Sequence, residues 1–108
     1  MDNKDKYNHA AEFPIRSGVT GRQIPEASLI CNLPGGEAGD PGLMTHDDVE
    51  TFFHEFGHLV HALVSGCHAW VGISGISTEQ DFVEAPSQML EEWTRDTATL
   101  QTFAKHYQ

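Results

Sequence analysis

Basic residues are scarce in this sequence. Six lysines and arginines face sixteen aspartates and glutamates, which gives a net charge of −10. This balance opposes the attraction of nucleic acid and of anionic membrane surfaces, so neither is expected as a partner. We expect most of the excess charge to lie on a solvated surface rather than in a binding site.

Cysteine is nearly absent, and long hydrophobic runs are missing. Cys31 and Cys67 are the two cysteines, which are too few for a disulfide framework and lack the close pairing of a zinc ribbon. The first residues lead into no apolar run long enough for a signal peptide or a membrane span. A cytoplasmic chain is therefore expected, unless the segment was cut from something longer.

The chain has 108 residues, with 39% apolar and 20% charged residues, which suits one packed domain at most. Residues 7–33 predict a β-hairpin, because apolar residues alternate from 11 to 15, a turn-forming Ser-Gly-Val-Thr-Gly cluster fills 17–21, and 27–33 is an apolar run. Residues 34–44 predict a loop, because glycine and proline punctuate them.

Residues 45–65 carry the strongest helical pattern. Thr45 suits an N-cap, and acidic residues follow in the first turn. Apolar residues then recur at helical spacing, at Val49, Phe52, Phe53, Phe56, Val60, Leu63 and Val64. Residues 66–80 predict a connection, and 81–106 predict a second long helix whose regular part begins late because of Pro86. The expected fold class is α+β, mainly α, with a short N-terminal hairpin followed by two long helices.

His54-Glu55-Phe56-Gly57-His58 forms an H-E-x-x-H sequence inside the first predicted helix. Side chains four residues apart project from one helical face, so both imidazoles can bind one tetrahedral zinc ion. Glu55 is rotated by about 100° from His54 and can reach a zinc-bound water instead. The alternative is an exposed helical face that happens to hold two histidines.

A glutamate near the start of the second predicted helix, Glu84, is a candidate third ligand. Spacing alone leaves four other carboxylates open, namely Glu79, Asp81, Glu91 and Glu92. Zinc is the metal expected from the ligand types, with cobalt or manganese as alternatives.

Three further polar residues share the helical side of the two histidines. His61 is expected to have a supporting or merely polar role. Asp47 and Glu50 either compensate the helix dipole or orient a ligand imidazole through its second nitrogen. Gly57 costs about 0.8–1.0 kcal/mol relative to alanine inside a helix, which predicts a close approach by another part of the chain.

Two blocks in the same order resemble the zinc oligopeptidase family of thimet oligopeptidase, neurolysin and oligopeptidase A. They are Phe-Phe-His-Glu-Phe-Gly-His at 52–58 and Asp-Phe-Val-Glu-Ala-Pro-Ser-Gln at 81–88, followed by Glu-Trp at 92–93. The likeness extends to residues 6–11 and 27–33. The resemblance implies that His54, His58 and Glu84 bind one zinc ion and that Glu55 is the catalytic base.

The family members are several times longer, mainly helical, and enclose a channel for short peptides. We therefore expect residues 1–108 to be a single segment, the zinc-binding core of a larger metallopeptidase domain, with the remainder of that domain as its partner. The predicted function is zinc-dependent hydrolysis of short peptides, in which Glu55 activates a zinc-bound water. The alternatives are a non-catalytic metal-binding segment, which lacks the family's downstream substrate-binding residues, and a free-standing interaction module.

Overall fold

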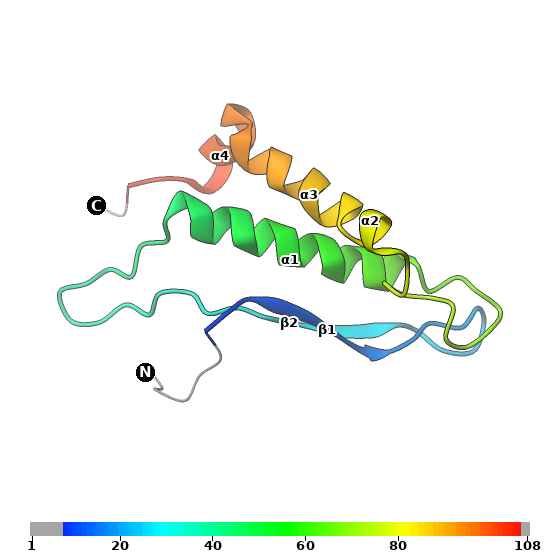
Figure 1. Cartoon of the computed structure of the whole chain (residues 1–108). Coiled ribbons are helices and arrows are strands. Elements are labelled where there is room, and N and C mark those ends of the chain that lie inside the picture. The colour runs from blue at the N-terminus through cyan, green and yellow to red at the C-terminus, as the bar shows by residue number, and fades with distance from the viewer. Residues whose placement is uncertain (1–7, 107–108) are drawn as a thin grey trace.

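A computed structural model of the chain describes residues 8–106 (Figure 1). Part of the resemblance, at residues 6 and 7, lies outside the described residues, as do residues 107 and 108. The elements follow in the order β1 (Ala11–Arg16), β2 (Glu26–Ile30), α1 (His46–Val64), α2 (Gln80–Val83), α3 (Ala85–Glu91), a 3-10 helix η1 (Glu92–Arg95) and α4 (Thr97–Phe103). The described chain is α+β and mainly helical, as predicted.

The predicted hairpin is confirmed. Strands β1 and β2 pair antiparallel, with Ala11 opposite Ile30 and Glu12 opposite Leu29. The register is irregular between Pro14 and Arg16, which suits a residue that cannot donate to a ladder.

The predicted helix at 45–65 is confirmed as α1, with its start fixed by a capping box. The Thr45 hydroxyl accepts from the backbone N–H of Asp48, and the Asp48 carboxylate accepts from the backbone N–H of Thr45. The helix ends at Val64, with Ser65 as C-cap. Thus α1 places two of the predicted metal ligands on consecutive turns.

The prediction of one long helix over 81–106 is wrong. The structure has three short helices and a 3-10 turn instead. Pro86 has no N–H to donate to the carbonyl of Phe82, which breaks the helical ladder between α2 and α3. Asp96 is extended, with φ −80° and ψ 118°, and its side chain caps α4 by accepting from the backbone N–H of Thr99. A short polar residue suited to capping therefore starts a new helix where the periodicity predicted a continuous one.

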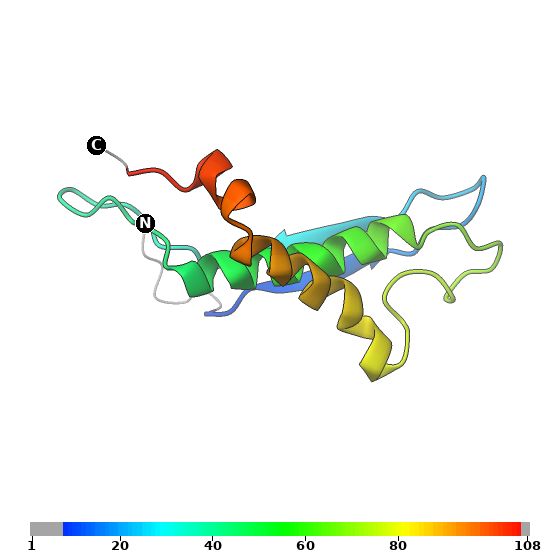
Figure 2. The same cartoon turned by 90° about the horizontal axis from the view of Figure 1, so that it is seen from above.

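Helix α1 lies between two layers. The hairpin covers one side of it and the α2–α4 segment covers the other (Figure 1), and α1 contacts both strands and α3. Seen from above, the path from α2 to α4 crosses α1 obliquely (Figure 2). This arrangement brings the beginning of α3 against the middle of α1.

The apolar core of the described residues is small. Val19 and Ala62 are its buried hydrophobic side chains, whereas Ile24, Trp70 and Val71 are 81%, 74% and 76% exposed. Apolar surface on this scale is typical of a segment that packs against further protein, and it is consistent with a piece of a larger domain. Within residues 8–106, no helix has the length and apolar character needed to cross a bilayer.

Candidate metal centre

The structure brings the three predicted ligands together. His54 and His58 come from adjacent turns of α1, and Glu84 lies at the junction of α2 and α3. The two Nε2 atoms of the histidines are 3.2 Å apart, and each lies 3.3 Å from Oε2 of Glu84. Three electron-pair donors from two separate segments thus form a nearly equilateral triangle.

The triangle has the dimensions of a zinc site. With zinc–ligand bonds of about 2.0–2.1 Å and tetrahedral angles, ligand atoms stand about 3.3–3.4 Å from one another. The three measured edges, 3.2 Å, 3.3 Å and 3.3 Å, come close to this value. Two imidazoles and one carboxylate also match the donor types of a zinc site that keeps its fourth position open. The residues present therefore fit the metal.

A close helix contact explains how Glu84 reaches α1. A Cβ on Gly57 would lie 2.5 Å from Cα of Ser87, so the glycine lets the backbones of α1 and α3 meet. Ser87 is fully buried at this contact. Its hydroxyl lies 2.9 Å from the carbonyl oxygen of Glu84 and 3.1 Å from the Oε2 carboxylate oxygen of that residue. The close approach predicted from Gly57 is confirmed, and its partner is α3, the helix that follows the predicted third ligand.

Glu55 lies outside the triangle, beside the hairpin. Its Oε2 accepts a hydrogen bond of 3.0 Å from the backbone N–H of Glu12 in β1. This bond joins positions 43 residues apart in the sequence. The carboxylate expected to serve as base is therefore anchored by a strand, whereas the three predicted ligands come from helical segments.

The side chain of Glu12 is an unusual feature near this site. Both of its carboxylate oxygens are buried without a hydrogen-bond partner among the described residues. Burial raises the pKa of Glu12; the nearby His58 opposes this shift, and the nearby Glu55 adds to it. A carboxyl group thus stands close to both a predicted ligand and the predicted base.

Glu91, one of the four carboxylates that spacing left open as alternatives to Glu84, contacts the site from outside the triangle. Oε1 of Glu91 makes a short contact with Nδ1 of His54, on the side of the ring opposite the triangle. Glu92 instead faces Arg95, at 3.1 Å. Spacing contained a signal for this contact, since Glu84 and Glu91 are seven residues apart and would share one face of the helix predicted over 81–106.

The other polar residues of the α1 face have different surroundings. The ring of His61 packs edge-on against Phe82 and lies outside the triangle. Glu50 pairs with Arg95 at 3.2 Å, and the second nitrogen of His54 contacts Glu91 instead. Potential ligand atoms also gather at the exposed start of α1, in His46, Asp47 and Glu50, but Nε2 of His46 is already engaged with the carbonyl of Thr94 at 3.0 Å.

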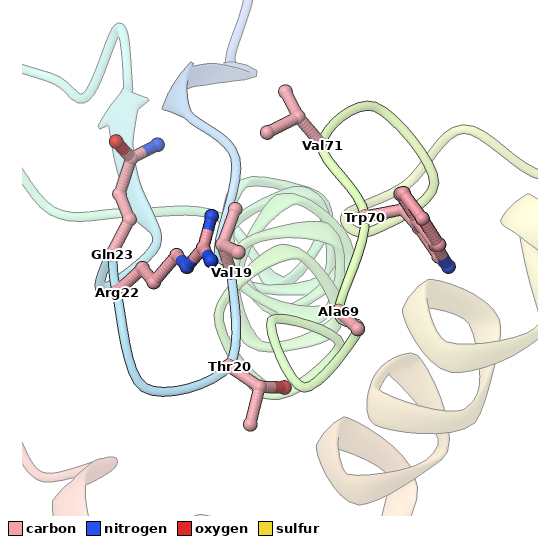
Figure 3. Close-up of a pocket in the computed structure, with 7 residues that line it drawn as sticks. All are labelled: Val19, Thr20, Arg22, Gln23, Ala69, Trp70 and Val71. Carbon is pink, nitrogen blue, oxygen red and sulfur yellow. The ribbon is translucent and has the colours of Figure 1, made fainter.

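A separate hollow of about 740 Å³ lies away from the triangle (Figure 3). It is bordered by the turn that joins the two strands and by the connection between α1 and α2. The backbone N–H of Thr20 donates to the carbonyl of His68 across these two segments, at 2.9 Å. The lining contains no histidine, cysteine or carboxylate, and its members are Val19, Thr20, Arg22, Gln23, Ala69, Trp70 and Val71.

Comparisons with known proteins all identify the same protein family. The family model described as peptidase family M3 matches residues 1–108. The chain is 45% identical over 92 residues to a thimet-like oligopeptidase of Dictyostelium discoideum. This aligned stretch covers 82% of this chain and 14% of that protein. The chain is 42% identical over 107 residues to saccharolysin of Saccharomyces cerevisiae, covering 94% of this chain and 15% of that protein.

A bacterial relative gives the same result. Oligopeptidase A of Escherichia coli is 42% identical over 95 residues, covering 87% of this chain and 14% of that protein. The chain thus spans only 14–15% of the length of these curated relatives. The match of the family model over the whole sequence, together with these relatives, shows that the chain belongs to peptidase family M3.

Proposed function

We propose that this chain is the zinc-binding core of a metalloendopeptidase that hydrolyses peptide bonds in short peptides. In this proposal His54, His58 and Glu84 hold one zinc ion, and Glu55 is the general base. The observation that carries the proposal is the triangle of donor atoms, whose edges of 3.2 Å and 3.3 Å suit tetrahedral zinc. Membership of a peptidase family supports the reaction type.

The chemistry divides between the metal and the protein. Zinc bound at the triangle would polarise the scissile carbonyl and make a bound water more acidic. Glu55 accepts a proton from the attacking water and then donates it to the leaving amine. Oε2 of Glu55 accepts from the backbone N–H of Glu12, a bond that orients the carboxylate and still leaves lone pairs on both oxygens for that proton.

Substrate recognition in this proposal needs more protein than the 108 residues. The relatives named oligopeptidase are about six times as long as this chain, since aligned stretches of 92 and 95 residues make up 14% of each. We propose that the remainder of the parent domain packs on the exposed apolar side chains and supplies most contacts to short peptides. A cytoplasmic location belongs to the same proposal.

The test combines metal analysis with peptide cleavage. Mass spectrometry of the purified chain should find about one zinc ion per molecule. Glu55→Gln should keep this zinc and lose cleavage of a quenched fluorescent peptide by at least about 100-fold. Glu50→Gln is the matched control, because Glu50 also lies on α1 but pairs with Arg95, so zinc content and cleavage should persist. Absence of zinc from the wild-type chain would overturn the proposal.

A second candidate function is favoured by the short length of the chain. It spans 14–15% of its relatives, so the segment on its own is a candidate non-catalytic metal-binding unit. One zinc ion per chain with no cleavage by the wild-type segment would assign this second function to the segment on its own and would exclude a stand-alone enzyme. Cleavage that Glu55→Gln abolishes would favour the first.

A further inference from the structure

The contact between His54 and Glu91 specifies where the imidazole carries its proton. Nδ1 of His54 lies against Oε1 of Glu91. An ionised carboxylate can only accept hydrogen bonds, so the ring must donate, and Nδ1 carries the hydrogen. Nε2 also lies 3.3 Å from a carboxylate oxygen, Oε2 of Glu84, so the assignment rests on the closer contact, the hydrogen bond between Nδ1 and Glu91. A neutral ring protonated at Nδ1 has its free electron pair on Nε2, the atom that faces His58 and Glu84.

The surroundings of the contact strengthen it. The side chains of His54 and Glu91 are 26% and 23% exposed, whereas that of the neighbouring Glu92 is 65% exposed. A hydrogen bond to a carboxylate is screened less when both partners are partly withdrawn from water. Glu91 is also the last residue of α3, and its carbonyl accepts from the hydroxyl of Thr94 at 2.7 Å. The Glu91 carboxylate therefore projects from a helix end whose backbone carbonyl is hydrogen-bonded.

The second histidine lacks an equivalent hydrogen bond. Nδ1 of His58 is buried and has no hydrogen-bond partner among the described residues. The two predicted ligands thus differ in how their orientation is fixed, and a change at position 91 should act on His54 alone.

We propose that Glu91 is a positioning residue for the metal centre: it holds His54 in the tautomer and orientation that direct Nε2 to the cation. This inference rests on the proposed function, because it concerns the zinc site assigned there. Partners of this kind fix the ring of a ligand histidine and increase its basicity, and their loss costs about 10–100-fold in metal affinity.

The test uses the 108-residue chain with two readouts. The first is the tautomer of His54 in the metal-free protein, from the ¹⁵N chemical shifts of its ring in NMR spectra. The second is zinc affinity, from competition with a chromophoric chelator. Wild-type protein should show the Nδ1–H form of His54, and Glu91→Ala should lose this preference and bind zinc about 10–100-fold more weakly.

Two further variants separate positioning from general damage to the fold. Glu91→Gln keeps an oxygen that accepts from Nδ1–H, so it should retain the tautomer and recover much of the affinity lost in Glu91→Ala. Glu92→Ala is the matched control, because it removes an adjacent carboxylate that faces Arg95, and it should change neither readout.

The outcomes distinguish this inference from the proposed function. If the wild-type chain binds zinc and Glu91→Ala binds it within about twofold as tightly, the inference is overturned and the zinc site stands. If wild-type protein binds no zinc, the proposed function fails, and this inference fails with it. An unchanged His54 tautomer in Glu91→Ala would also overturn the inference, whatever the zinc affinity.

Discussion

Gly57 and Ser87 meet where α1 and α3 cross, with no room for a methyl group between them. A Cβ built on Gly57 would lie 2.5 Å from Cα of Ser87 and 2.9 Å from the carbonyl oxygen of Pro86. These atoms are backbone, so they cannot move aside as the end of a side chain can. The glycine between the two histidines therefore sets the distance at which the segment carrying Glu84 docks.

Gly57→Ala should destabilise the protein. At an open helical position this change would stabilise by about 0.8–1.0 kcal/mol, but here the methyl group overpacks the contact, at a cost of about 1–3 kcal/mol. Thermal denaturation should show a lower midpoint, and zinc affinity should fall because Glu84 is pushed away from the histidines. Gly35→Ala is the control, because a Cβ there would meet nothing within 4 Å. A midpoint unchanged or raised by Gly57→Ala would contradict the packing argument.

Removing any one of the three proposed ligands should abolish stoichiometric zinc binding. His54→Ala, His58→Ala and Glu84→Ala each delete one corner of the donor triangle, and zinc per chain should fall to near zero in mass spectrometry. His61→Ala is the matched control, since His61 lies on the same helix but packs against Phe82. Zinc content equal to wild type in the Glu84 variant would exclude that residue as a ligand.

Thr45→Ala should weaken the start of α1. The hydroxyl of Thr45 accepts from the backbone N–H of Asp48 at 3.2 Å, and loss of such a cap costs about 1 kcal/mol. Chemical denaturation should report this loss as a shifted midpoint with an unchanged slope. Thr51→Ala, at an exposed position within the same helix, should stay within about 0.5 kcal/mol of wild type. Equal effects at both positions would show that the cap does not contribute.

The capping box should also make stability depend on acid. Hydrogen bonds from the side chain and backbone of Thr45 lower the pKa of Asp48 below its ordinary value of 3.8. A carboxyl group whose pKa is lowered by folding stabilises the protein above its unfolded pKa and loses this effect as the pH falls through its folded pKa. Wild type should therefore be more stable than Asp48→Asn at pH 6, and the difference should shrink below about pH 4. A difference that stays constant with pH would contradict the linkage.

The sequence predicted those features that depend on local pattern. The apolar stripe and the cap of α1 are both short-range signals, and the structure has that helix where they place it. The long second helix failed because its apolar spacing competes with two local preferences that break it, a proline without an N–H at 86 and a capping aspartate at 96. The spacing of apolar residues alone does not predict where such residues break a helix.

At the candidate site, the features that the sequence did not predict depend on tertiary contacts. Spacing left several carboxylates open as third ligand, because the path of the chain between α1 and α3 decides which one arrives. Glu91 was among them, and its place beside His54 follows from the oblique crossing of α3 over α1 (Figure 2). The bond from Glu12 to Glu55 was not predictable from residue types, since a backbone N–H is present at nearly every position.

That last bond affects how mutations in the hairpin should be interpreted. The donor to Glu55 is the main chain of β1 at position 12, and every amino acid except proline supplies the same amide. Replacing side chains along the strand one at a time would therefore leave the support of Glu55 intact and would miss it. The strand can change its residues freely in this respect, provided that it keeps its path beside α1.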